Sequence, residues 1–166
     1  MSASYDYLPA SVGSGSNTRI SASFAGKVFM VRVYVSVAAI LAADGGSSLA
    51  SSTQITAAED IGVYAIPKNT IVRRVRTNVI TASTDTTATI DIGDDDDDDG
   101  FDSAVDITSD STNAITIDGT DAYGTTGGNF YSSNDTLDVL FNNDTTNGVF
   151  NLVIMCYDLS DAAYDD

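Results

Sequence analysis

Six consecutive aspartates, Asp94 to Asp99, are the residues whose type and spacing could most clearly do chemistry. Read from Asp95, the segment DDDDDGFDSAVD matches positions 1, 3, 5, 6 and 12 of an EF-hand-style loop, which wraps hard oxygen ligands around Ca²⁺ and needs glycine at its sharp turn. The match is partial, because a run of aspartates satisfies any alternating pattern and position 12 is Asp instead of the usual Glu. Two interpretations stay open: a solvated acidic loop, or a calcium site whose ligands are Asp95, Asp97, Asp99 and Asp106. No cofactor is required by either, and Ca²⁺ is the one optional ligand.

A second cluster is basic: Arg73, Arg74 and Arg76 are three of the seven Lys and Arg residues. On a regularly alternating strand Arg74 and Arg76 share a face with Val72 and Asn78, and Arg73 lies opposite. The arginines either pair with the protein's own carboxylates or form a protein interface, where the planar guanidinium pairs carboxylates bidentately. We expect Arg73, Arg74 and Arg76 to be candidate partner contacts.

The residue types that are missing exclude most enzyme classes. The sequence has no His and a single Cys, Cys156, which lies in the apolar segment VIMCY and is expected in the core. Without His there is no Ser-His-Asp triad, Cys-His dyad or His-ligated zinc. Glycoside hydrolysis needs two acids held on either side of a sugar, and nothing singles out such a pair among 24 acidic residues. We expect a protein that is not an enzyme.

The net charge of −17 excludes several partners. Binding to DNA, RNA or anionic lipid depends on Lys and Arg that neutralise phosphates, so neither a nucleic acid nor a membrane is an expected partner. No basic segment followed by an apolar run opens the sequence, and the longest apolar stretch, residues 28–43, is interrupted by Arg32 and is too short to span a bilayer. The expected protein is soluble and made in a cytoplasm.

The elements that must position these clusters are strands. Thr, Val and Ile are spread through the chain, and Asp-Gly, Gly-Gly and Asn-Gly pairs punctuate it, which is typical of many short strands joined by tight turns. Residues 28–37 alternate, with one wholly apolar face made by Phe29, Val31, Val33, Val35 and Val37. We predict an all-β protein, an antiparallel β-sandwich or jelly roll, in which residues 71–80 and 86–92 pair with each other.

The predicted organisation has three parts. Residues 1–17 are rich in Ser and Gly and form an extended N-terminal arm, residues 18–160 form the β-sandwich domain, and residues 161–166 form an acidic tail. Tyr5, Tyr7 and Leu8 are unusual for a pure spacer, so we expect them to contact a partner surface.

The order of short motifs resembles that of small structural proteins of tailed bacteriophages, in particular head decoration (cement) proteins. The resemblance covers residues 27–160, more by layout than by identity. It is carried by Ile66-Pro67, a Val and Ile strand at 71–80, IDIG at 90–93, Asp99-Gly100-Phe101, Asp135-Thr136-Leu137 and the closing segment 153–158. Two features depart from the pattern: Lys68-Asn69 stands where Ala-Gly is more usual, and the aspartate run is longer than the common loop.

This resemblance implies a jelly roll that sits as a homodimer or homotrimer on the capsid exterior and clamps neighbouring copies of the major capsid protein. The high negative charge agrees with a subunit that must stay soluble at high copy number. The alternative is a binding module of a phage tail or fibre, an adhesin that uses the acidic loop, with or without Ca²⁺, to hold a host glycan.

Overall fold

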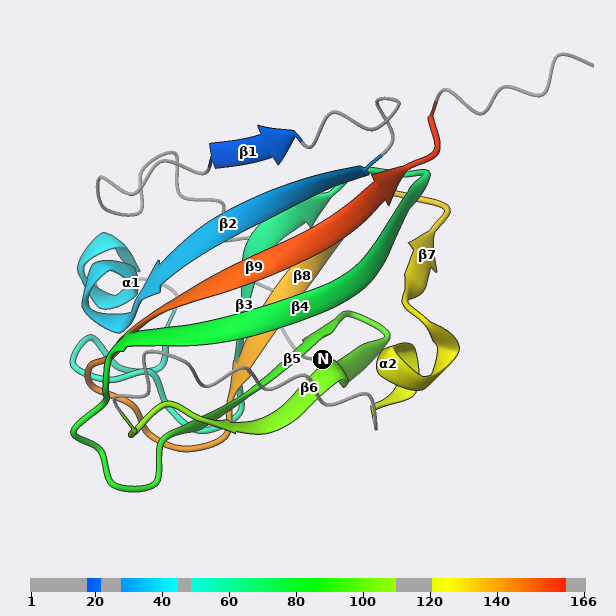
Figure 1. Ribbon diagram of the computed structural model, residues 1–166. Helices are drawn as coiled ribbons and strands as arrows, with labels where there is room; N and C mark the ends of the chain where they lie inside the picture. The colour runs from blue at the N-terminus through cyan, green and yellow to red at the C-terminus, as the bar shows by residue number, and fades with distance from the viewer. Residues whose placement is uncertain (1–17, 22–27, 45–48, 110–120, 161–166) are drawn as a thin grey trace, which may run out of the picture.

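Two antiparallel β-sheets stacked face to face make up the protein (Figure 1). The computed structural model describes residues 18–21, 28–44, 49–109 and 121–160. One sheet has the strand order β1-β2-β9-β4-β7 and the other β3-β8-β5-β6, which confirms the predicted all-β sandwich. The elements are β1 (Thr18–Ser21), β2 (Val28–Ser36), α1 (Val37–Asp44), β3 (Glu59–Ile66), β4 (Thr70–Thr81), β5 (Thr89–Asp94), β6 (Asp97–Asp106), α2 (Ala122–Thr126), β7 (Asn129–Tyr131), β8 (Asp135–Phe141) and β9 (Val149–Asp158).

Parts of the predicted organisation lie outside the described residues. Tyr5, Tyr7 and Leu8 of the expected arm and residues 161–166 of the expected tail belong to these parts. The arm, the tail and their contacts therefore stay predictions.

The strand pairing is that of one long hairpin folded over itself. β2 pairs with β9, β3 with β8, β4 with β7 and β5 with β6, and successive pairs fall on alternate sheets. This nested arrangement of eight strands in two sheets is a jelly roll. The turn at Pro67 is a corner between the sheets, and Asn69 takes a left-handed φ of 60° there, a conformation that Asn tolerates.

One predicted pairing is wrong. β4 pairs with β7 and β9, whereas β5 pairs with β6 and β8, so the segments 71–80 and 86–92 lie in opposite sheets. Each strand has an apolar face, with Val75 and Val79 on β4 and Ile90 and Ile92 on β5, and all four side chains are buried. In facing layers, both strands bury their apolar faces against the one core from opposite sides.

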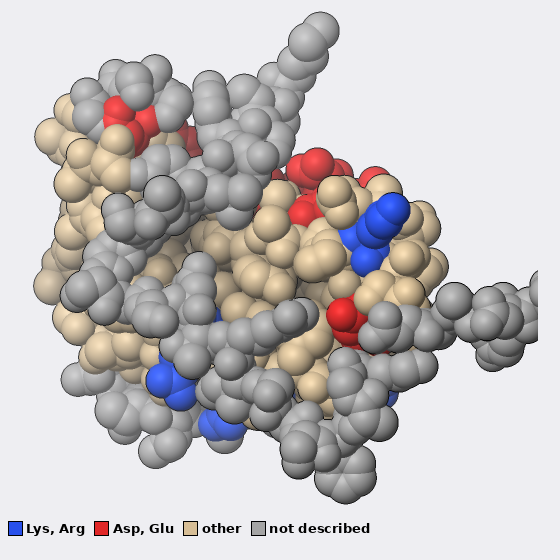
Figure 2. Space-filling model, turned by 90° about the horizontal axis from the view of Figure 1, so that it is seen from above, with Lys and Arg blue, Asp and Glu red and all other residues tan. Residues whose placement is uncertain are grey.

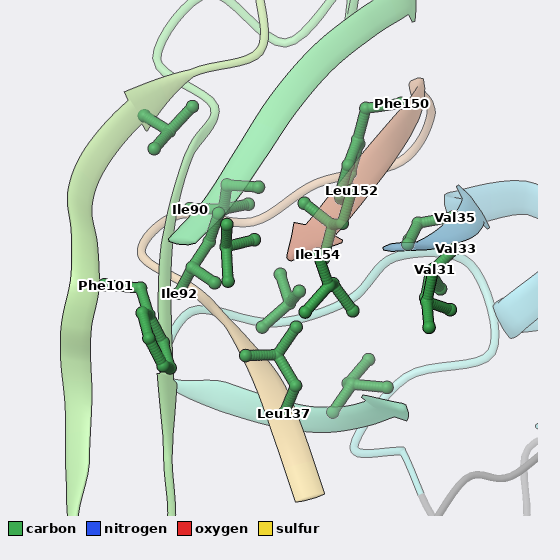
Figure 3. Packing of buried hydrophobic residues seen from close by; sticks show 14 of the residues in the cluster. Val31, Val33, Val35, Ile90, Ile92, Phe101, Leu137, Phe150, Leu152 and Ile154 are labelled. Atoms are coloured by element: carbon green, nitrogen blue, oxygen red, sulfur yellow. The ribbon is translucent and has the colours of Figure 1, made fainter. Parts of the chain in front are cut away.

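The core lies between the two sheets (Figure 3). On β2 the alternation is as predicted, since Phe29, Val31, Val33 and Val35 are buried. They meet the inward side chains of β9 and the opposite sheet, among them Phe150, Leu152, Ile154, Leu137 and Phe141. Cys156 is fully buried, as expected of a small core residue.

The stretch after β2 is helix α1. The Ser36 hydroxyl accepts a hydrogen bond of 3.3 Å from the Ala39 N–H at its start, and the Val37 N–H donates to the Gly148 carbonyl at 3.1 Å. Within the described ranges, no helix has the length and apolarity needed to cross a bilayer.

Candidate interaction face

A β-bulge in β4 brings the three clustered arginines to one side of the sheet. Val72 pairs with Cys156 and Arg74 with the next residue of β9, Met155, so Arg73 is an extra residue without a partner in the register. Both Val72 and Val75 therefore reach the core, while Arg73 and Arg74 are exposed. The prediction that Val72 shares the face of Arg74 and that Arg73 lies opposite is wrong, because it assumed unbroken alternation.

The arginines frame an apolar strip on β9. In the register across β2, β9 and β4, Val153 lies between Arg32 and Arg76, and Met155 lies between Met30 and Arg74. The Arg73 guanidinium carbon lies 6.0 Å from the centre of the Tyr157 ring, within cation–π range. We call this surface the basic face; its members are Arg32, Arg73, Arg74 and Arg76 around Val153, Met155 and Tyr157.

Among the described residues, the outward positions of the basic face carry no carboxylate. Those of β2 and β4 hold Val, Met, Tyr, Ser, Arg, Asn, Ile and Thr, and those of β9 hold Val, Asn, Met and Tyr. In Figure 2, two patches of basic side chains lie toward the lower edge, bordered largely by grey residues, and a third lies toward the upper right close to acidic atoms. Four of the seven basic residues thus gather on a face whose described outward positions hold no acid, in a protein of net charge −17.

The aspartate run is divided by its position in a hairpin. Asp94 ends β5 and pairs with Asp97, the first residue of β6, so the run forms the tip of the β5–β6 hairpin. Asp94 is fully buried, whereas Asp95, Asp96, Asp98 and Asp99 are exposed. We call residues 93–100 the aspartate hairpin.

The buried Asp94 carboxylate ties this hairpin to the other sheet. It accepts hydrogen bonds from the Tyr131 hydroxyl (2.6 Å), the Tyr123 hydroxyl (2.8 Å) and the Asn129 amide (3.0 Å), and from the N–H groups of Asp96 and Asp97 (both 3.1 Å). Burial and the hydrogen bonds to Asp94 raise the pKa of both tyrosines well above the usual value, so they stay protonated donors. Asp94 therefore holds α2 and β7 against the end of β5.

The calcium loop expected from the spacing is not formed, because Asp97–Asp106 is strand β6. Asp106 pairs with Thr89 at the far end of the hairpin from Asp95, and its carboxylate accepts hydrogen bonds of 2.7 Å from the N–H and hydroxyl of Thr108. The structure thus does not bring Asp95, Asp97, Asp99 and Asp106 together. Among the residues that it describes, no group of three or more His, Cys, Asp or Glu is placed to hold a metal ion. Calcium binding by the four aspartates stays a prediction.

Two carboxylates lie on the outer face of the sheet opposite the basic face. Asp138 alternates with the core residues Leu137 and Val139, yet it is only 3% exposed; the Thr136 hydroxyl on the same strand is a donor beside its carboxylate, which has no other hydrogen-bond partner among the described residues. Desolvation raises the pKa of Asp138 to about 7, with the charges of Asp60, Asp95 and Asp135 adding to it and the Thr136 hydroxyl opposing it. Desolvation likewise raises the pKa of Asp60 to about 6, and Asp98 and Asp95 add to the shift.

Sequence reasoning missed three of these residues. Alternation with Met30 and Tyr34 places Arg32 on the outward side of its strand, but the sequence does not link Arg32 to the distant arginine cluster. Asp138 is likewise a charged residue inside an apolar segment, TLDVLF, and alternation places it on the outward side of its strand. Asp94 carried no signal of its own, because nothing in a run of identical residues tells which one is buried.

The fold has known relatives among solved structures. No family model matches the chain, and no curated protein matches it in sequence. It is similar to a chain of the "Cyanophage Pam1 capsid asymmetric unit", with a TM-score of 0.54 and 17% identity over 91% of this chain and 99% of that one. A second chain, from the "Acidic stable capsid structure of Helicobacter pylori bacteriophage KHP30", has a TM-score of 0.42 and 12% identity over 80% and 87% of the two chains. At this identity the likeness to the Pam1 chain shows a shared fold.

Proposed function

We propose that this chain is a structural protein of a bacteriophage virion, a decoration protein that binds the exterior of the head and bridges neighbouring copies of the major capsid protein. The observation that carries the proposal is the basic face, an arginine-framed apolar strip whose described outward positions hold no carboxylate, in a strongly acidic protein. The fold likeness to a chain of a phage capsid supports it, because the match spans 99% of that chain. The motif order of the sequence points the same way.

The composition of the basic face suits a protein partner. Arginine, methionine and tyrosine are enriched at protein interfaces, where buried apolar area supplies affinity and guanidinium groups pair with carboxylates. The face is made of paired strands, so it can dock without reorganising its backbone. We infer a partner surface that is apolar at its centre and acidic at its rim.

The distribution of charge also sets an orientation. With the basic face on the shell, the sheet that carries Asp60, Asp138 and the aspartate hairpin points away from it. An outward acidic surface keeps decorated particles soluble and apart. Two basic faces repel each other, so a homodimer or homotrimer forms through other surfaces, for which Phe130, 51% exposed on β7, is a candidate. Weak contacts of one oligomer with several capsid subunits then add up to strong overall binding through multivalency.

The test is binding of the purified protein to expanded phage heads that lack it, measured by sedimentation and then by cryo-electron microscopy. We expect saturable occupancy at symmetric lattice positions and a higher rupture temperature of the decorated heads. Arg74→Glu should weaken binding at least tenfold. Its matched control is Lys68→Glu, which makes the same change of charge at the exposed corner between β3 and β4.

Two results would contradict the proposal. Equal loss with both variants would mean that net charge, and not the basic face, governs binding. No binding of the unaltered protein to heads would reject decoration and direct the search to the tail, where binding of a host glycan with and without Ca²⁺ tests the adhesin alternative.

A further inference from the structure

The surroundings of Asp138 are unusual for a carboxylate on the outer face of a sheet. Its register neighbours are Gly62 on β3 and Gly93 on β5, so neither adjacent strand offers a side chain to cover it or to donate to it. A Cβ at Gly93 would collide with the Asp97 carbonyl oxygen and the Asp98 main chain. The main chain of the aspartate hairpin therefore lies over Gly93, beside Asp138, and seals this part of the face.

Asp60 shares this sealed region. It lies two residues from Gly62 on β3, diagonal to Asp138 across the strand pair, where side chains can still reach each other. One of its carboxylate oxygens, Oδ1, is buried without a hydrogen-bond partner among the described residues. The charged groups that face the pair are acidic too: Asp95 and Asp98 from the hairpin and Asp135 from β8.

A buried carboxylate with few donors is costly when it is charged, and a second acid beside it raises the cost. Protonation of Asp138 removes this cost and, unlike a bound metal ion, needs no additional space. No three carboxylates in the described part of the chain are grouped to hold a metal.

We propose that Asp138 and Asp60 form a proton-controlled lock beneath the aspartate hairpin. With Asp138 protonated, the hairpin packs closed over the outer face of its sheet. When Asp138 loses its proton, the charged pair draws in water and the hairpin opens. The exposed acidic tip would then change its shape across the mildly acidic to neutral range. This inference concerns the free protein and does not depend on the proposed function.

The experiment is an NMR titration of the full chain from pH 4 to pH 8 that follows the side-chain carboxyl carbons of Asp138 and Asp60 together with the amides of Asp96 and Asp97. We expect Asp138 to ionise near neutral pH and the hairpin amides to shift in the same step. Hydrogen exchange at these two amides, corrected for the intrinsic rate, should be at least tenfold faster at pH 8 than at pH 5.

Asp138→Asn should remove this pH dependence and keep the amides protected at pH 8. Asp96→Asn is the matched control, because it takes one charge from the same hairpin at an exposed position and should leave the titration of Asp138 in place. The lock is rejected if Asp138 ionises near pH 4, if it ionises near neutral pH without a change at the hairpin amides, or if Asp138→Asn retains the pH dependence.

Discussion

The two outer faces of the sandwich are built from the same kind of alternating strands but have opposite chemistry. On β2, β9 and β4 the outward positions combine arginine with Met, Val and Tyr, whereas the sheet of β3, β8, β5 and β6 carries buried and exposed aspartates. On the basic face Arg32, Arg73 and Arg74 are exposed. The acidic face is closed by its own hairpin, through Asp94 on the core side and the main chain over Gly93 on the outer side. Under the proposed function, one face serves docking and the other serves internal stability and solubility.

The largest expected effect comes from removing the anchor of the acidic hairpin. Asp94→Ala leaves two tyrosine hydroxyls, an amide and two backbone N–H groups without their acceptor. We expect a loss of about 3–5 kcal/mol in the free energy of unfolding, measured by urea denaturation. Asp95→Ala, an exposed neighbour, should change it by no more than about 0.5 kcal/mol. Similar losses in both variants would contradict the special role of Asp94.

The second prediction is that the acidic face makes stability depend on pH. The pKa of Asp138 is raised to about 7 and that of Asp60 to about 6, from the ordinary 3.8, so between these values the folded state binds more protons than the unfolded state. Their contribution is fully present below pH 3.8 and is lost as pH rises toward 7, by up to about 1.4 kcal/mol per pH unit for each group. Hydrogen bonds from Thr146 and Thr108 lower the pKa of Asp85 and Asp106, which act in the opposite sense; Asp85 is partly exposed and Asp106 exposed, so they count for less.

Denaturation at several pH values between 4.5 and 7.5 checks this sign. Asp138→Asn should flatten the decline seen for the unaltered protein. A free energy of unfolding that rises with pH by the same amount in the unaltered protein and in Asp138→Asn would contradict this prediction.

The third prediction separates binding from stability on the basic face. Met155→Ser removes apolar area from the centre of the face without touching the core, since Met155 points outward between buried Ile154 and Cys156. We expect binding to phage heads to weaken about tenfold, or about 1.4 kcal/mol, with a smaller change in the free energy of unfolding. A variant that binds normally would remove the apolar strip from the proposed interface.

The smallest effect concerns the edge of the same sheet. Phe130 is 51% exposed on β7, so Phe130→Ser should leave the free energy of unfolding within about 0.5 kcal/mol of the unaltered protein. If this edge mediates self-association, sedimentation equilibrium should show a shift toward monomer. An unchanged distribution would exclude Phe130 as a self-contact.

The sequence by itself determined the class of fold and much of its core. Period-two alternation in residues 28–37 and the apolar closing strand predicted which side chains are buried, because alternate side chains of a strand must point to opposite faces. Composition excluded His-dependent chemistry, because the sequence has no His and no other residue type can replace it. The clustering of Arg73, Arg74 and Arg76 in the sequence is enough to make them candidates for contact with a partner protein.

Only the tertiary structure decided how these pieces combine. Pairing of distant strands places β4 beside β9 and not beside β5, and a bulge of one residue turns Arg73 to the side of Arg74, which alternation cannot foresee. Equally, six identical aspartates have identical local sequence, so the burial of Asp94 depends on Tyr123 and Tyr131, which follow it by 29 and 37 residues. The cost of burying a charge is set by which donors surround it, and those donors are brought there by the fold.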